Sequence, residues 1–235
     1  MSSKSSVELI PWDSESPSHV QTLIIQRQHC GWDSELVEPK WRDQQRSGTK
    51  CIYWIVLSAK DREIREKLEL HFSMYKDEQV VLHDTSSSIR GVLRTPSRDS
   101  FHPIGHISLD SVNSDVQDID LDLPDEGVYW IKTFYVSRAL QGQGVGRAAM
   151  DLVESMAVDE PLCATTLALD TRQKNTQIEQ EKFLSGGQEP GGVTNEEWYA
   201  RRGYRLIKVV ANYYPPPPGY GCQDNRTVFM RKDIE

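Results

Sequence analysis

Residues Tyr135–Met150 read YVSRALQGQGVGRAAM and carry three glycines at every second position: Gly142, Gly144 and Gly146. Glycine has no Cβ, so the backbone N–H groups of such a stretch can approach a bound anion closely. The residues after Gly144 have the spacing of a helix, and the N-terminus of a helix offers unpaired N–H groups and the positive end of its dipole. We therefore expect a phosphate-binding turn at this point.

The segments on either side of the turn have clear periodicities. Val128–Val136 (VYWIKTFYV) is β-branched and aromatic nearly throughout, which predicts a central strand. From Val145 to Ala157, apolar residues recur every three or four positions, as on one face of a helix. Ala164–Asp170 (ATTLALD) predicts a further strand. Strand, helix and strand in this order favour parallel pairing of the two strands with a right-handed crossover.

Two other phosphate-binding motifs can be compared with this turn. A Walker A loop needs Lys followed by Ser or Thr, but Arg147 and Ala148 stand there. The dinucleotide-binding pattern G-x-G-x-x-G/A fits residues 144–149, and Asp170 ends a strand at about the expected distance. Against that pattern, residues 137–143 separate the strand from Gly144, and no run of further strand–helix units follows.

Two linked motifs resemble those of the GNAT superfamily of acyl-CoA-dependent N-acetyltransferases. The first, Gln/Arg-x-x-Gly-x-Gly/Ala, is met by Gln141-x-x-Gly144-x-Gly146 after the strand and the spacer YVSRALQ. The second, Tyr-x-x-x-Gly-Phe/Tyr, is met by Tyr199-Ala-Arg-Arg-Gly203-Tyr204. The resemblance is firm over residues 128–170 and 194–210 and looser over 51–58 and 104–110.

This resemblance implies an α/β fold. We expect a single GNAT-type N-acetyltransferase domain over residues 1–235, with a mixed, mostly antiparallel sheet flanked by helices. The family's fourth and fifth strands, here 128–136 and 164–170, would form a splayed parallel pair. Residues 59–102 and 171–193 are interpreted as insertions into that domain.

The resemblance also implies acetyl-CoA as the acyl-donor co-substrate. The backbone of Phe134, Tyr135 and Val136 would pair with the pantetheine arm. The pyrophosphate would be held by the backbone of the glycine turn and the first turn of the helix, namely Gln141, Gly142, Gln143, Gly144, Val145, Gly146 and Arg147. No metal ion is expected.

The reaction implied by the family is direct attack of a neutral amine on the thioester in a ternary complex. An N–H group near Val136 would stabilise the oxyanion. Tyr199 occupies the family's position for the acid that meets the departing thiolate. The proton acceptor is open: His106 is the first candidate, Glu126 the second, and a water relay to solvent the third. A structural role is also open for His106 and for Tyr199.

The predicted function is therefore transfer of an acetyl group to a primary amine, of a small molecule or alternatively of a peptide. One alternative is a catalytically silent acyl-CoA-binding regulatory protein, which the absence of an obvious base favours. The other is a dinucleotide-binding oxidoreductase. We expect a monomer or a homodimer.

Composition limits the other possibilities. The chain has 235 residues and a net charge of -8, which disfavours nucleic-acid binding and hints at a cationic amine as partner. The longest apolar run, residues 51–57, is shorter than a membrane span. No secretory signal is evident, and the scattered cysteines predict reduced, buried thiols of a cytoplasmic protein: Cys30, Cys51, Cys163 and Cys222.

The remaining segments predict the rest of the architecture. Strands are expected at residues 7–10 (stopped by Pro11), 51–58, 104–110, 204–210 and 226–232, and helices after Ser16-Pro17, over 38–46 and over 195–202. A helix over 62–75 would place Ile64, Leu68, Phe72 and Tyr75 on its inner face. Thr194 and Glu197 predict a capping box. Residues 171–193 are polar and rich in Gln and Gly, which predicts a long loop.

Overall fold

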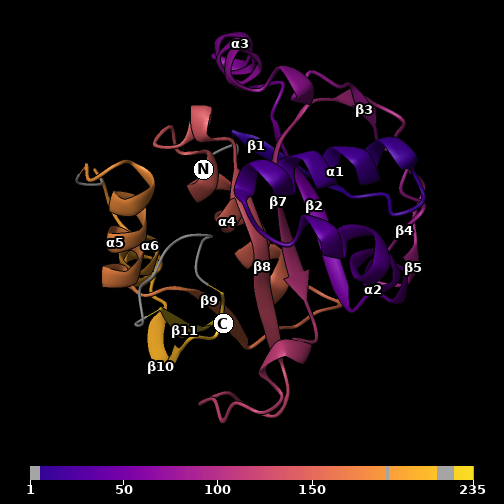
Figure 1. Ribbon diagram of the computed structural model, residues 1–235. Coiled ribbons are helices and arrows are strands. Elements are labelled where there is room, and N and C mark those ends of the chain that lie inside the picture. Colours follow the sequence, from indigo (N-terminus) through magenta and orange to yellow (C-terminus); the bar gives the residue numbers. More distant parts are fainter. Residues whose placement is uncertain (1–5, 189–190, 216–224, 235) are drawn as a thin grey trace. The chain divides into compact units, whose positions relative to one another are not determined.

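The computed structural model describes residues 6–188, 191–215 and 225–234, and its chain is traced in Figure 1. Two compact units make up the chain. The larger unit comprises residues 1–112 and 130–162, and the smaller unit comprises residues 113–129 and 163–235.

The larger unit contains β1 (Val7–Pro11), α1 (Pro17–Cys30), η1 (Ser34–Leu36), the π-helical turn η2 (Val37–Trp41), α2 (Arg42–Ser47), β2 (Lys50–Leu57), α3 (Ile64–Met74), η3 (Lys76–Glu78), β3 (Leu82–His83), β4 (Ser88–Ile89), β5 (Val92–Leu93), β6 (Ser100–Phe101), β7 (Pro103–Asp110), nearly all of β8 (Val128–Val136), η5 (Arg138–Leu140) and α4 (Val145–Val158). The smaller unit contains η4 (Ser114–Val116), β9 (Thr166–Arg172), α5 (Lys174–Leu184), α6 (Asn195–Arg201), β10 (Arg205–Ala211) and β11 (Arg226–Asp233).

In the larger unit, antiparallel pairing joins the strands in the order β1-β2-β7-β8. Every residue of β2 and β7 is buried, as expected of central strands. The first strand is confirmed and ends at Pro11, one residue later than predicted, because Pro11 still pairs with Tyr53. Within the larger unit β1 pairs along one side only, with β2, and a proline is tolerated where its missing N–H faces away from the ladder.

Side chains alternate between two faces of this sheet. Ile52, Trp54 and Val56 of β2 belong to a core cluster with Trp12, Val20 and Leu23, so one face lies under α1. The other face carries Cys51, Tyr53, Ile55 and Leu57, together with Ile107 and Leu109, which pair opposite Tyr53 and Cys51. That second face lies under α4, which contacts both β1 and β7.

Helix α4 forms as its apolar spacing predicts. Its buried residues are Val145, Ala149, Met150, Val153 and Ala157, and it begins at Gly144 in the left-handed conformation. Small and β-branched apolar side chains on one stripe allow close packing on the sheet. The helix and β8 therefore place the glycine turn on rigid supports at both ends.

A bulge interrupts the pairing of β7 with β8. Between the paired positions His106–Tyr135 and Ser108–Lys132, one residue of β7 opposes two of β8. Thr133 takes a positive φ of 48° at this point. Across the ladder, a Cβ on Gly105 would collide with the carbonyl oxygen of Tyr135, so glycine is required there.

Helix α3 is confirmed, and its predicted inner residues Ile64, Leu68, Phe72 and Tyr75 are all half-buried. The most buried residues on that side are two polar ones that were not predicted, Lys67 and His71. Lys67 is held by Asp61 at 2.8 Å. Because Lys67 and His71 are polar, hydrophobic spacing alone could not identify them as buried.

In the smaller unit, antiparallel pairing joins β9, β11 and β10 in that order. The capping box of α6 is confirmed, with the side chains of Thr194 and Glu197 bonded to each other's backbone N–H groups.

The long loop predicted for residues 171–193 is wrong, because Lys174–Leu184 forms α5. The buried side chain of Gln180 donates to Asn225 Oδ1 at 3.0 Å, so this helix is held through polar contacts rather than an apolar stripe.

The α/β class, with helices flanking a mostly antiparallel sheet, is confirmed. The parallel pairing of the two strands around the glycine turn and the two insertions stay predictions.

Cys51 is buried as expected, but Cys163 is exposed and Cys30 half-buried; Cys222 and most of the proline run lie outside the described residues. Among the described residues, no helix combines the length and hydropathy that a membrane span requires.

Candidate active site

The glycine turn leaves β8 through the short helix η5 and enters α4. Gly142 and Gly144 have positive φ angles of 78° and 84°, and no atom lies within 4 Å of a Cβ built on either. Residues 141–144 are all exposed. The first-turn amides of α4, including those of Gly146 and Arg147, have no partner within the helix. Their N–H groups and the helix dipole together suit a diphosphate.

Two glutamine side chains fix the shape of this turn. Gln141 Nε2 donates to the carbonyl oxygen of Val136 at 3.2 Å, and Gln143 Nε2 donates to that of Ala139 at 3.1 Å. Gly146 differs from the other two glycines, since its φ is ordinary and a Cβ would make normal contact with the Phe134 ring at 3.5 Å. The requirement for glycine is thus strongest at 142 and 144.

The predicted pantetheine-binding residues lie at the end of β8. Tyr135 and Val136 are buried, Phe134 is half-buried, and Ser137, directly after the strand, is fully buried. The Ser137 N–H donates to the carbonyl oxygen of Ile104 at 2.9 Å, which continues the pairing with β7 past the bulge. The ten predicted cofactor-binding residues thus run from the end of β8 to the first turn of α4, and their contacts with a cofactor stay predictions.

His106 lies on β7 directly opposite Tyr135 and is fully buried. Its Nδ1 lies 2.9 Å from Gln26 Oε1. Gln26 Nε2 donates to two acceptors, a carboxylate oxygen of Glu78 at 2.8 Å and the carbonyl of Pro103 at 3.1 Å, so Oε1 must be the acceptor from His106. His106 is then neutral with its proton on Nδ1. Its Nε2 keeps a lone pair and has no hydrogen-bond partner among the described residues.

The electrostatic setting of His106 favours the neutral ring. Burial, together with the positive charges of Arg27 and Lys50, holds the pKa of His106 well below its usual value. The side chain can therefore accept a proton only transiently. Whether it does so in a reaction stays a prediction.

Two predicted catalytic residues belong to the smaller unit. Tyr199 lies on α6 with its ring 5.8 Å from that of Tyr204. Burial and the negative charge of Asp170 raise the pKa of the Tyr199 hydroxyl, which therefore stays protonated as an acid must. Glu126 is exposed in the segment before β8.

Sequence reasoning missed a group of buried polar residues in the larger unit. Glu78, His71 and Gln26 are all fully buried, although they come from η3, α3 and α1. The only signal in the sequence was a set of His and Glu residues inside a segment interpreted as an insertion. No spacing rule connects residues so far apart in the chain.

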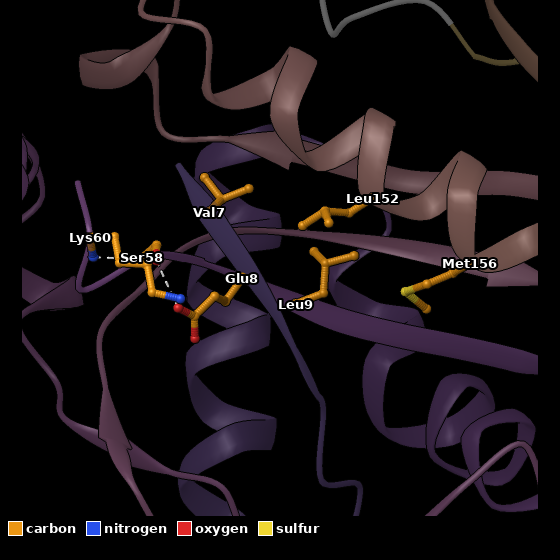
Figure 2. Close-up of a pocket in the computed structure, with 7 residues that line it drawn as sticks. All are labelled: Val7, Glu8, Leu9, Ser58, Lys60, Leu152 and Met156. Carbon is orange, nitrogen blue, oxygen red and sulfur yellow. Dashed lines mark hydrogen bonds between the residues drawn. The ribbon is translucent and has the colours of Figure 1, made fainter. Parts of the chain in front are cut away.

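A groove with a volume of about 490 Å³ lies elsewhere on the larger unit. Figure 2 shows Val7 and Leu9 of β1 pointing toward Leu152 and Met156 of α4, with Glu8 and its hydrogen-bond donor Ser58 at one end. Its lining includes none of the predicted site residues.

Solved structures with this fold were found by comparison. The chain is similar to NAA60 of Arabidopsis thaliana in complex with a bisubstrate analogue (13% identity, TM-score 0.52, 97% of this chain and 98% of that chain). The same protein with acetyl-CoA gives a TM-score of 0.51. An aminoglycoside 6'-N-acetyltransferase complexed with coenzyme A is also similar (11% identity, TM-score 0.51, 97% of each chain). At these identities the likeness shows the fold.

The sequence itself was compared with curated proteins and with families. No curated protein matches it. The acetyltransferase (GNAT) family profile matches residues 59–179, which is more than half of the 235 residues and includes the glycine turn. The resemblance inferred from the two motifs is thus confirmed, and the chain belongs to the acetyltransferase (GNAT) family.

Proposed function

We propose that this protein transfers the acetyl group of acetyl-CoA to a primary amine in a ternary complex. The observation that carries the proposal is the glycine turn: two left-handed glycines open the N-terminus of α4 directly after a buried strand. Membership of the acetyltransferase (GNAT) family supports acetyl-CoA as the donor. The dinucleotide-binding alternative loses its basis, because the turn lies inside the matched family region.

The roles of the chain's residues follow from their chemistry. Acetyl-CoA supplies an activated thioester. We propose that the amides from Gln141 to Arg147 hold its diphosphate and that the backbone of Phe134–Val136 orients the pantetheine arm. The N–H group of Val136 would face the oxyanion. Tyr199 would protonate the leaving thiolate, and His106 or Glu126 would receive the proton of the amine.

Binding of the donor is tested by thermal unfolding. Coenzyme A and acetyl-CoA should raise the melting temperature, whereas NAD should not. Gly144→Val should abolish that shift, since its φ of 84° is strained for a β-branched residue and the side chain would stand where the anion approaches. Gly191→Ala, at an exposed position with open space around it, is the matched control. An unchanged shift in Gly144→Val would refute the diphosphate site.

Catalysis is tested by release of the coenzyme A thiol with a panel of primary amines. Tyr199→Phe should lower turnover by about tenfold or more with little change in acetyl-CoA affinity. Turnover equal to that of the unmodified protein would remove Tyr199 from the mechanism. The alternative, a silent acyl-CoA-binding protein, predicts stabilisation by acetyl-CoA with no thiol release from any amine.

The class of acceptor is proposed from charge and chemistry. A net charge of -8 favours a cationic amine, such as a polyamine or an aminoglycoside-like compound. The neighbours include an aminoglycoside acetyltransferase and NAA60 bound to a bisubstrate analogue, so the amine panel should contain aminoglycosides, polyamines and peptides with free N-termini.

A further inference from the structure

The buried polar residues that sequence reasoning missed form a connected cluster around Glu78. Its carboxylate is fully buried in the larger unit. One oxygen lies 2.6 Å from His29 Nδ1, and the other accepts from Gln26 at 2.8 Å and lies 3.5 Å from His71 Nε2. Burying a carboxylate costs free energy unless hydrogen bonds or opposite charges compensate for the lost water. The three polar neighbours of Glu78 supply part of that compensation.

One branch of this cluster reaches the glycine turn. His71 Nδ1 lies 2.9 Å from the hydroxyl oxygen of Ser137, the residue that follows Val136. Helix α3, which carries His71, packs against η5, the first part of the turn. The imidazole of His71, in the segment 59–102, therefore lies next to the end of β8, where the thioester is proposed to bind.

A second branch reaches the surface. His29 Nε2 lies 3.1 Å from a carboxylate oxygen of Asp77. The exposed fraction rises along this branch from 0% at the Glu78 side chain to 24% at His29 and 54% at Asp77. A chain of polar groups thus runs from Ser137 through His71, Glu78 and His29 to Asp77 at the surface, and only its step from His71 to Glu78 is longer than a hydrogen bond.

The branch through Gln26 ends differently. Gln26 connects Glu78 to His106, but an amide neither gains nor loses a proton at neutral pH. Gln26 therefore positions Glu78 and His106, whereas an imidazole such as that of His71 can accept a proton at one nitrogen and release it from the other.

We propose that Glu78 is the terminal proton acceptor of the acetyl-transfer reaction, protonated through Ser137 and His71 and deprotonated along the same path once the product has left. The proposal rests on the proposed function. In the resting state we assign the Ser137 hydroxyl as donor to His71 Nδ1, which leaves the proton of His71 on Nε2. This Nε2 makes no hydrogen bond among the described residues, and the nearer Glu78 oxygen lies 3.5 Å away, so the pair must approach for the proton to pass.

The proton transfer balances without any further reactant. As the amine nitrogen bonds to the acetyl carbon, its proton passes to Ser137 Oγ while the serine's own proton passes to His71 Nδ1. The Nε2 proton of His71 passes to Glu78. After the amide product has left, the same transfers in reverse pass the proton from Glu78 through His71 and Ser137 to water in the emptied site, which restores the first tautomer of His71.

The acid–base properties of the two central groups suit these roles. Burial raises the pKa of Glu78 above its usual value, against the opposing hydrogen bonds from His29 and Gln26, which makes the carboxylate a better proton acceptor. Burial, with the nearby His102 and His29, lowers the pKa of His71 to about 4, so this ring passes a proton on rather than storing it. The ionisable groups around these two side chains are His29 and Cys30 from α1, Tyr75 after α3, Asp77 from η3, His102, His106 from β7 and Tyr135 from β8.

The test is the pH dependence of turnover in Glu78→Gln, with the amine on the panel that the unmodified protein acetylates fastest. The variant should lose about tenfold or more in kcat. It should also lose the rise of kcat/KM with pH on the acid side, where Glu78 would otherwise become ionised. Stabilisation by coenzyme A should be unchanged, since Glu78 does not belong to the diphosphate site.

Two further variants separate a proton relay from a structural role. Asp61→Asn, which changes a similarly buried carboxylate that pairs with Lys67, should keep the acid limb of the pH profile. Ser137→Ala removes only a hydroxyl and should slow kcat several-fold while keeping the coenzyme A shift. It replaces Glu78→Gln as the deciding variant if that protein does not fold.

The possible outcomes separate a failure of the proton relay from a failure of the proposed function. Turnover in Glu78→Gln with the normal pH profile, or unchanged kcat in Ser137→Ala, overturns the relay and leaves the proposed function standing. An unmodified protein that coenzyme A does not stabilise overturns the proposed function itself. Binding of coenzyme A with no thiol release from any amine overturns catalysis and the relay together.

Discussion

The two faces of the sheet in the larger unit are built differently. The face under α4 presents apolar side chains from every strand, among them Val7, Ile55, Ile107 and Ile131, all nearly inaccessible to solvent. The face under α1 has an apolar centre but also buries His106, Ser108 and Asp110 in a row along β7.

The apolar face and the polar face therefore have different roles. The apolar face fixes α4, and with it the N-terminus that opens the glycine turn. The polar face buries ionisable groups beside the end of β8, at a cost in stability that only paired partners offset. If the reaction moves a proton as proposed, the buried ionisable groups of the polar face are the ones able to take part in that transfer.

The largest expected effect is on the polar face. Lys50 Nζ contacts Asp110 at 2.8 Å, Ser108 at 3.1 Å and the ring of Trp41 at 4.9 Å from its centroid. Lys50→Met leaves the buried carboxylate of Asp110 without its partner and should lower the free energy of unfolding by about 3–5 kcal/mol. Chemical denaturation measures this loss.

The same pair supplies its own controls. The double variant Lys50→Met with Asp110→Leu should recover most of the loss, because no unpaired charge is then left. Arg46→Met breaks an ion pair with Glu15 that is largely exposed and screened by water, and should leave the free energy of unfolding almost unchanged. A double variant as unstable as the single one would contradict this account of the polar face.

An intermediate effect is expected where β7 and β8 approach at the bulge. Gly105→Ala would drive a Cβ into the carbonyl oxygen of Tyr135, so the strands must separate. We expect a loss of about 1–3 kcal/mol and weaker stabilisation by coenzyme A, measured in the same thermal unfolding experiment. Equal melting temperatures for this variant and the unmodified protein would show that the bulge tolerates a side chain.

On the apolar face, a conservative change should cost less. Ile107→Val removes one buried methylene group beneath α4 and should lower the free energy of unfolding by about 1 kcal/mol. Neither turnover nor its pH profile should change. A shifted pH profile in Ile107→Val would mean that the two faces are coupled and that the comparison is wrong.

The smallest expected effect concerns pH. The pKa of His71 is lowered to about 4 by burial, and the ring regains its ordinary value near 6.5 when the protein unfolds. The stabilising contribution of the neutral ring is therefore fully present above pH 6.5 and is lost as pH falls toward 4. In His71→Gln, unfolding free energy should fall less steeply over that interval. An unchanged slope would show that the ring is not held neutral.

The site was predictable where its residues are neighbours in the chain. Gly142 and Gly144 indicated the turn, and the apolar spacing from Val145 predicted the helix that follows. The polar helix α5 was missed because its contacts, such as that of Gln180 with Asn225, join residues that no periodicity links.

By itself, the sequence determined the strands, the glycine turn, the helix behind it and the family to which they belong, because each depends on local spacing. Only the tertiary structure decided that His71 lies beside Ser137 and Glu78 beside His71. Hydrogen bonds between residues as distant in the chain as His71 and Ser137 form only once packing has brought α3 onto the turn, and burial then sets their pKa values.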